Sequence, residues 1–330
     1  MSFSFSSLGT APSGTVDGLF LKQFAGEVIT AFETSNVMMP LHTVRTISQG
    51  KSAQFPVVGT GAAEYHTAGS SLIDDGSLSS IIHNERKIGI DGLLTSYAFI
   101  DSLDEAKNHY DFRSEYSRKL GYALSKKADE QLMKVMYNAS QAAAVSPQAI
   151  GGGDVEITGA VSDTAVTSAN LVTALFTAAA KLDASFVPDQ DRYVVLNPTL
   201  YYALLSGGNG TFDVSTTVAN TDIGGSGFNN GQVPMIAGFK IYKTNNLPTA
   251  TSTDDALVSP DNSYDHTIPT NGLKGLVFHK SAIGTVKLRD LSMESEYQIE
   301  RQGSLMVAKY AMGHGILRPD CAIALVNKAA

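Results

Sequence analysis

The residues that first suggest chemistry are Gly50, Lys51 and Ser52, which match the last positions of a phosphate-binding loop. Such a loop also needs a glycine five residues before Gly50, and Arg45 occupies that position. The loop should lead into a helix, because a helix N-terminus helps to bind the phosphate. Here it leads into SAQFPVV (52–58), whose composition predicts a strand. These departures argue against nucleotide binding, and a nucleotide-binding enzyme is kept only as an alternative.

The histidines and serines supply no other catalytic or metal site. The seven histidines are scattered, and none stands at metal-ligand spacing from another. We expect His314, between Gly313 and Gly315, to be a turn or interface residue rather than a general base. The run Gly224-Gly225-Ser226-Gly227 misses the nucleophile elbow, because Phe228 stands where that motif ends in glycine. The sequence therefore predicts a protein that is not an enzyme and has no catalytic residue, metal or cofactor.

The single cysteine, Cys321, excludes a disulfide framework and a thiolate metal cluster. It lies in the apolar run CAIALV (321–326), where we expect a small buried side chain. The N-terminus, MSFSFSSLGTAPSG, lacks the basic and apolar regions of a signal peptide, and no run reaches membrane-spanning length. We therefore expect a soluble protein of a reducing compartment, with no membrane partner.

Charge is unevenly distributed along the 330 residues, which carry a net charge of −8. This negative net charge differs from the positive net charge that is typical of proteins that bind nucleic acid. Residues 60–110 hold eight acidic and three basic side chains, whereas residues 111–140 hold six basic and four acidic ones. Opposite charge on separate elements either balances within one subunit or makes copies of the chain complementary to each other.

The stretch from Asp111 to Ser140 predicts one long amphipathic helix of about 40 Å, lying across a sheet. Ala123 and Val135 are expected to fill its apolar face, and a coiled coil is the rival interpretation. The apolar face repeats every fourth residue, at Tyr116, Leu120, Leu124, Ala128, Leu132 and Met136. The opposite, solvated face carries Arg118, Lys119, Lys126, Lys127, Asp129, Glu130 and Lys134.

A long hairpin is predicted before this helix. The runs 51–58 and 81–94 have the composition of strands, and the Gly/Ser-rich insert 59–80 between them contains no Lys or Arg. The insert carries the acidic residues Glu64, Asp74 and Asp75. Because such a hairpin has too little apolar surface to stand alone in water, it either folds back on its own domain or lies on a neighbour.

The sequence of the N-terminal region predicts a loose arm followed by a strongly apolar helix. Residues 1–15 are rich in Ser and Gly, and Phe20, Phe24 and Phe32 then fall at helical spacing behind the cap Asp17. This helix must dock either on its own subunit or, as an assembly clamp, on another.

The remaining segments mix helices and strands without a βαβ repeat, which predicts the α+β class. Ser168 should cap a second helix, and Asn197-Pro198 should begin a third. The expected strands are 155–157, 192–197, 239–244, 273–279, 285–291, 304–312 and 321–326.

Several segments, taken in order, closely resemble the major capsid proteins of T7-like (autographivirus) short-tailed phages. The resemblance covers the chain apart from 141–166 and 206–272. It is carried by GEVITAF (26–32), GKSAQFPV (50–57), IDGLLT (90–95), NHYDFRSEY (108–116), SAIGTVKLRDL (281–291) and AKYAMGHGILRP (308–319).

This resemblance implies the HK97-like capsid fold, with an N-terminal arm, an extended E-loop hairpin, a P-domain built on a long spine helix, and an A-domain. The implied divisions are 1–50 for the arm, 51–95 for the E-loop, 96–190 for the P-domain with the spine helix at 114–139, 191–279 for the A-domain, and 280–330 for the return to the P-domain.

The resemblance also implies a function. Hexamers and pentamers of the chain would build an icosahedral T=7 head around double-stranded DNA, assembled in the host cytoplasm on a scaffolding protein. A portal would occupy one vertex, and a decoration protein could bind outside. Some members of the wider fold cross-link subunits through Lys–Asn bonds, which the Lys-free tip excludes here. The residues expected between subunits are Phe20, Phe24, Phe32, Glu64, Asp74, Asp75, Arg118, Lys119, Lys126 and Lys127.

Two alternatives besides the nucleotide-binding enzyme stay open. A bacterial nanocompartment shell protein shares the fold, although no cargo-docking surface can be identified in the sequence. An adhesion module is suggested only by the Asn/Thr-rich region 206–272.

Overall fold

The computed structural model describes residues 36–58, 83–103, 112–143, 151–157, 168–206, 235–248, 258–268 and 272–327, with isolated positions between them. The chain divides into two compact units. The first contains Met1–Asn36, Gly92–Asp129 and Leu288–Met312, and the second contains Val37–Asp91, Glu130–Lys287 and Gly313–Ala330. Within the described residues the longest helix is α3 (Phe112–Gln141), and the longest strands are β9 (Ile283–Gln298) and β10 (Gly303–Ile316).

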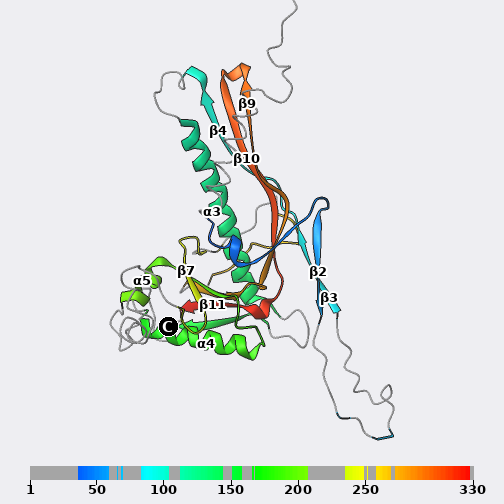
Figure 1. The fold of residues 1–330 in the computed structure, drawn as a ribbon, viewed down its shortest axis with the longest axis vertical. Helices are drawn as coiled ribbons and strands as arrows, with labels where there is room; N and C mark the ends of the chain where they lie inside the picture. Colours follow the sequence, from blue (N-terminus) through cyan, green and yellow to red (C-terminus); the bar gives the residue numbers. More distant parts are fainter. Residues whose placement is uncertain are drawn as a thin grey trace, which may run out of the picture. The chain divides into compact units, whose positions relative to one another are not determined.

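In the first unit, helix α3 lies along a sheet (Figure 1). Strand β4 (Leu94–Asp101) pairs antiparallel with β10, from Asp101 opposite Gly303 to Leu94 opposite Tyr310. Arg113 of α3 donates a hydrogen bond to the hydroxyl of Ser304 at 3.4 Å, so the helix covers the sheet face that carries Ser304. The sheet order is β1-β9-β10-β4, in which β1, the start of β9 and the end of β10 belong to the second unit.

The predicted apolar face of α3 is confirmed over most of its length. Leu120, Leu124, Ala128, Leu132 and Met136 are all buried, as is Val135. The helix is longer by two residues at each end than the expected 114–139.

Three expectations about α3 were wrong. Ala123 is exposed, because it lies one turn from Lys119 and Lys127 on the outer side of the helix. Tyr116 is 39% exposed, in the second turn of the helix. Asp129 is buried, since it neighbours Ala128 at the edge of the buried stripe. Periodicity alone places such border residues poorly, because a helical step of 100° leaves them between the two faces.

The second unit is built on a sheet with the order β5-β11-β8-β6-β7. Strand β6 (Arg192–Leu196) is buried throughout and pairs parallel with β7 (Lys240–Lys243). Helix α5 (Pro198–Ser206) connects these two strands, and Asn197 caps it by accepting a hydrogen bond from the Thr199 amide at 3.1 Å. Strands β5, β6 and β7 all run parallel, so the helix between β5 and β6 (Ser168–Ala184) gives a second βαβ connection, and the expected absence of a βαβ repeat was wrong. The α+β class still holds, because β8 runs antiparallel to both of its neighbours in the same sheet.

The other strands of this sheet come from distant parts of the sequence. Strand β11 (Ala322–Asn327) pairs parallel with β5 (Gly153–Ile157) and antiparallel with β8 (Leu273–His279). Helix α4 (Ser168–Ala184) packs against β5, and its Leu171, Leu175 and Leu182 are fully buried. The core therefore unites α4, the sheet and the C-terminal half of α3.

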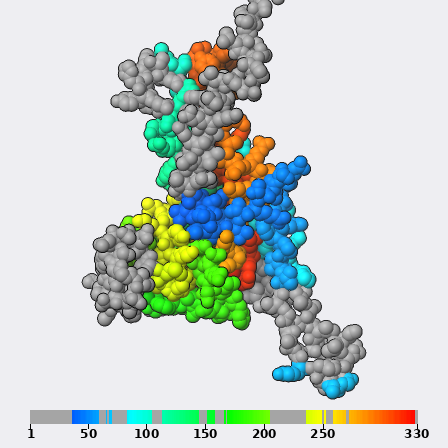
Figure 2. Space-filling view, in the orientation of Figure 1, coloured from blue at the N-terminus to red at the C-terminus, as the bar shows by residue number. Residues whose placement is uncertain are grey.

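The predicted hairpin has its base in a two-stranded ribbon, β2 (Ser52–Val58) and β3 (His83–Gly89). The register runs from Ser52 opposite Gly89 to Val58 opposite His83, with Pro56 opposite Glu85. The expected single strand over 81–94 was wrong, because the chain leaves the ladder after Gly89 and starts β4 at Leu94. Figure 2 shows the ribbon, in blue and cyan, at the surface.

Two further expectations are corrected. His314 lies within strand β10 and is buried, rather than in a turn or at an exposed surface. Cys321 ends the short 3-10 helix Pro319–Cys321 instead of starting β11, although it is buried as predicted. Strand β1 (Thr43–Thr46), for which the sequence showed no clear pattern, pairs parallel with the start of β9.

Candidate assembly surfaces

The main candidate surface is a basic stripe along α3, formed by Arg118, Lys119, Tyr122, Ala123, Lys126 and Lys127, all of which are exposed. Successive members lie one and three residues apart, so they follow one side of the helix for more than two turns. The four basic residues are thus brought together as expected. Their positive charge is partly balanced by Glu115, which accepts a hydrogen bond from Arg118 at 3.3 Å.

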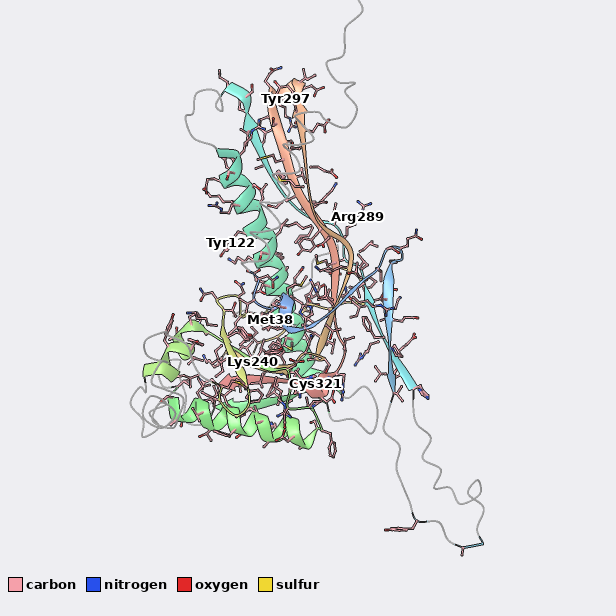
Figure 3. All side chains as sticks on the ribbon, viewed as in Figure 1. Met38, Tyr122, Lys240, Arg289, Tyr297 and Cys321 are labelled. Atoms are coloured by element: carbon pink, nitrogen blue, oxygen red, sulfur yellow. The ribbon has the colours of Figure 1, made fainter. Side chains whose placement is uncertain are left out.

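Tyr122 is the member of this stripe that charge alone did not reveal. Its ring is 57% exposed and lies between the basic residues, on the side of α3 away from the sheet (Figure 3). Arginine and tyrosine are both enriched in protein interfaces, because each combines a polar tip with a large apolar body. The signal was available in the sequence, since Tyr122 stands four residues from Arg118 and four from Lys126.

The other expected site residues lie outside the described part of the chain. These are Phe20, Phe24 and Phe32 of the N-terminal arm and Glu64, Asp74 and Asp75 of the hairpin insert. At the end of the ribbon next to the insert, His83, Asn84 and Glu85 of β3 are exposed, and Val58 of β2 is 60% exposed. The ribbon therefore leads outward from a buried base toward solvent.

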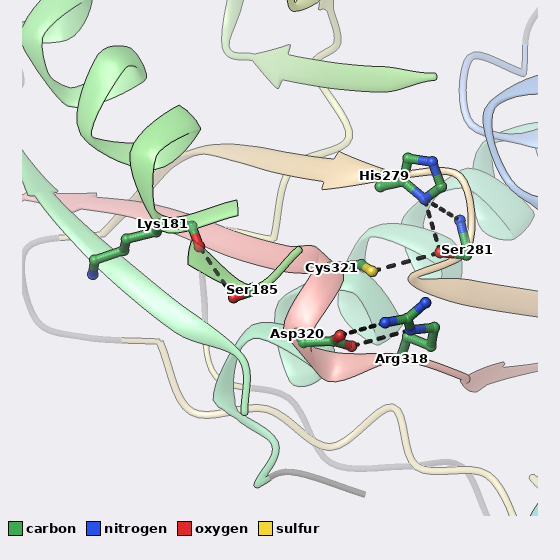
Figure 4. Close-up of polar contacts among 7 residues, drawn as sticks. All are labelled: Lys181, Ser185, His279, Ser281, Arg318, Asp320 and Cys321. Carbon is green, nitrogen blue, oxygen red and sulfur yellow. Dashed lines mark hydrogen bonds and ion pairs between the residues drawn. The ribbon is translucent and has the colours of Figure 1, made fainter. Parts of the chain in front are cut away.

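One cluster in the second unit brings a thiol, a hydroxyl and an imidazole together (Figure 4). Ser281 Oγ lies 3.5 Å from Cys321 Sγ and 2.8 Å from His279 Nδ1. Burial raises the pKa of the Cys321 thiol and lowers the pKa of His279. Because a buried neutral thiol is a poor nucleophile, this arrangement packs the start of β11 rather than forming a catalytic site.

A second buried cluster joins two histidines through one hydroxyl. His42 Nδ1 donates to the Met38 carbonyl at 2.8 Å, so its Nε2 is the acceptor that faces Thr285 Oγ1 at 2.6 Å. The Thr285 hydroxyl then accepts from His314 Nδ1 at 2.8 Å. These directions hold for neutral imidazoles, which burial favours by lowering the pKa of both histidines, and they assign one tautomer to each ring.

Burial dominates the electrostatics of this cluster. It lowers the pKa of His42 to about 4 and the pKa of His314 to about 3, and the nearby Lys287 acts in the same direction on both. His314 Nε2 has no hydrogen-bond partner among the described residues. The described residues also contain no group of three or more His, Cys, Asp or Glu side chains that could hold a metal ion.

Comparison with known proteins decides the family. The family described as "Gp10A-like: Major capsid protein" matches residues 54–326, which is most of the chain. The chain belongs to this capsid protein family. The major capsid protein of Escherichia phage T7 is 34% identical over 97% of this chain and 95% of its own length. That of Enterobacteria phage T3 is 34% identical over 93% of this chain and 91% of its own length.

The fold of this capsid protein agrees with a solved phage capsid. The capsid structure of the cyanophage P-SCSP1u matches with a TM-score of 0.77 and 40% identity, covering 100% of both chains. The chain therefore has the HK97-like α+β fold and is the major capsid protein of an icosahedral phage head, a component of the virion.

The alternative of a nucleotide-binding enzyme finds no support in this capsid protein. Gly50 and Lys51 lead into strand β2 and not into the helix that a phosphate-binding loop needs. The family is a family of structural shell proteins. No helix among the described residues is both long and apolar enough to cross a membrane.

Proposed function

We propose that copies of this chain form the hexamers and pentamers of a head that encloses double-stranded DNA. Assembly proceeds in the host cytoplasm on a scaffolding protein, and a portal occupies one vertex. The observation that carries this proposal is the match to a cyanophage capsid over 100% of both chains. The role of the subunit is mechanical, without catalysis, cofactor or sequence-specific DNA contact.

The domain division proposed for this shell is the one that the resemblance implies. Residues 1–50 serve as the arm, 51–95 as the E-loop, 96–190 and 280–330 as the P-domain, and 191–279 as the A-domain. The antiparallel pairing of β2 with β3 supports the E-loop assignment, because it places both ends of the insert at the outer end of one ribbon.

We further propose that the basic stripe on α3 receives the acidic hairpin insert of a neighbouring subunit. The stripe offers Arg118, Lys119, Lys126 and Lys127, and the insert offers Glu64, Asp74 and Asp75 without any Lys or Arg. A single exposed ion pair contributes only about 0–1 kcal/mol. Repetition around every capsomer makes the sum sufficient to fix register, because the contacts act multivalently.

Electron microscopy of the purified chain tests the shell proposal. We expect closed shells or rings of subunits when the chain is co-expressed with a scaffolding protein of the same phage group. Heads isolated from lysates should also contain DNA that resists nuclease until the shell is disrupted. Only small monomers, or closed shells that never contain DNA, would contradict the proposal, and closed shells without DNA would favour a nanocompartment.

A further inference from the structure

We propose that residues 259–267, which we call the clasp, tie the base of the β2–β3 ribbon to the C-terminal end of α3. The clasp thereby sets the direction in which the ribbon leaves the subunit. Its effect on shell assembly rests on the proposed function, in which the ribbon carries the E-loop to a neighbour. All residues of this arrangement belong to the second unit.

The central contact joins Asn262 to Gly89, the last residue of β3. The Asn262 side-chain oxygen accepts from the Gly89 amide at 3.1 Å, and its Nδ2 donates to the Gly89 carbonyl at 2.8 Å. One side-chain amide thus satisfies both backbone groups of Gly89, as a neighbouring strand would do. Asn262 is 5% exposed, so water does not compete for these bonds.

Asp91, two residues beyond the ribbon, gives the clasp a second attachment. Its Oδ1 accepts from the Ser259 amide at 3.0 Å and from Asn262 Nδ2 at 2.8 Å. Its Oδ2 accepts a hydrogen bond from the hydroxyl of Tyr264. The carboxylate therefore holds three clasp residues at once, and hydrogen bonds to a charged group are about twice as strong as neutral ones.

A turn and an ion pair complete this end of the clasp. The Asn262 amide donates to the Ser259 carbonyl at 2.9 Å, which closes a β-turn with Pro260 in its second position. Asp261, in the same turn, forms an ion pair with Lys87 of β3 at 3.0 Å. The turn thus presents Asp261 and Asn262 to the ribbon side by side.

Close backbone packing fixes the ribbon from the other side. A Cβ atom on Gly313 of β10 would come within 1.8 Å of the Gly89 carbonyl oxygen, and one on Gly315 would come within 2.7 Å of Ile88. Only glycine permits this approach. The end of β3 therefore lies between the clasp and β10, and the amide of His314 donates to the Tyr264 hydroxyl at 3.2 Å across the same region.

The far end of the clasp is held by α3. Asn138 Nδ2 donates to the carbonyls of Ser263 and Asp265, at 3.0 and 2.8 Å. The Tyr137 hydroxyl donates to the Thr267 carbonyl at 3.0 Å, and its ring meets that of His266 edge to face. Because hydrogen bonds are directional, these contacts permit only one path of the clasp between helix and ribbon.

Hydrogen exchange in unassembled subunits tests the clasp directly. We expect Asn262→Ala and the isosteric Asn262→Asp to speed exchange of the ribbon amides in 52–58 and 83–89 at least tenfold. Asn262→Asp keeps the volume but replaces the Nδ2 donor, placing a carboxylate oxygen next to Asp91. Asn197→Ala, which removes the cap of α5 but touches no clasp residue, is the matched control and should leave ribbon exchange unchanged.

Shell assembly of the same variants is scored separately by electron microscopy. We expect the Asn262 variants to form irregular or open shells, whereas Asn197→Ala closes normally. If ribbon exchange does not change, the clasp proposal is wrong. If exchange rises but shells close normally, the ribbon direction does not govern assembly, and the proposed E-loop role fails while the tie itself stands. Should Asn262→Ala not fold, Asn138→Ala severs the α3 end and must produce the same faster exchange.

Discussion

The imidazoles of His42 and His314 both contact one hydroxyl, that of Thr285, at 2.6 and 2.8 Å. His42 precedes β1, Thr285 belongs to β9 and His314 to β10, so the chain of bonds crosses three neighbouring strands of one sheet. Thr285 can serve both histidines only while His42 Nε2 is unprotonated, since a second proton would turn this acceptor into a donor.

We therefore predict that the folded subunit loses stability in weak acid. Above pH 6.5 both states contain neutral histidines, so the cluster adds no pH dependence. Below pH 6.5 the unfolded chain binds protons that the folded chain excludes, and the free energy of unfolding falls until the pH reaches the folded pKa of about 4 for His42 and about 3 for His314. For His42 alone, the difference from 6.5 to about 4 corresponds to about 3 kcal/mol.

Urea unfolding of unassembled subunits between pH 7.5 and 4.5 measures this effect. His42→Gln should reduce the fall in the free energy of unfolding between pH 7.5 and 4.5. The variant lacks one of the two histidines that take up a proton only when the chain unfolds. The exposed His83→Gln on β3 serves as control and should keep the native slope. An equal slope in all three proteins would show that the cluster does not govern acid sensitivity.

Helix α3 should respond differently on its two faces. Leu124→Ala and Leu132→Ala should each lower the free energy of unfolding by about 2–5 kcal/mol, because both side chains are buried and leave a cavity. Lys126→Ala, on the exposed stripe, should cost far less, within about 0.5 kcal/mol. Thermal unfolding of isolated subunits provides the comparison, and similar losses for all three variants would contradict the assigned face.

Removal of residues 1–34 should leave a folded subunit that cannot form closed shells. This expectation follows from the apolar helical pattern of Phe20, Phe24 and Phe32 behind a Ser/Gly-rich stretch. Circular dichroism should show a cooperative transition, while electron microscopy shows open or absent shells. Complete unfolding of the truncated chain would instead place this helix in the subunit's own core.

Charge reversal tests the contact between the basic stripe and the hairpin insert. Asp74→Lys with Asp75→Lys should impair assembly, most strongly at low salt, where charges are least screened. Adding Lys126→Glu and Lys127→Glu should restore part of it, whereas Lys240→Glu, an exposed lysine on β7, should not.

Two other outcomes would be informative for the stripe. Normal assembly of the doubly reversed hairpin at every salt concentration would remove the insert from the contact. Shells that close normally with Lys126→Glu and Lys127→Glu but package less DNA would show that the stripe faces the enclosed genome.

The long helix and most strands could be predicted from the sequence, because their burial repeats with a regular period. Leu120 to Met136 illustrate this, as does β6, where every residue is buried. The errors concern residues at the border between two helix faces and the position where a strand ends. Ala123 and Asp129 lie at the margin of the helix stripe, and the chain turns away between Gly89 and Leu94 without a proline to mark the turn.

The polar clusters were harder to predict, because their members meet only after folding. Asn262 and Gly89 are far apart in sequence, and the composition of 249–272, rich in Gly, Asn, Thr and Ser, predicts only a loop. A local signal existed in Ser259-Pro260-Asp261-Asn262, which has the composition of a β-turn. Nothing in the sequence indicated that this turn would face the ribbon, since that partner is set by the tertiary fold.

Pro56 in strand β2 has a consequence for how free subunits behave in crowded solution. Beyond Gly89, whose backbone groups bind Asn262, the edges of a two-stranded ribbon could add a strand from another molecule and begin aggregation. Proline has no N–H, so it fits a paired strand only where its nitrogen points away from the partner strand. Pro56 is paired with Glu85, and its nitrogen therefore faces the outer edge of β2. On the other strand, the charges of Glu85 and Lys87 oppose the same reaction. Both features make it less favourable for the ribbons of free subunits to pair edge to edge.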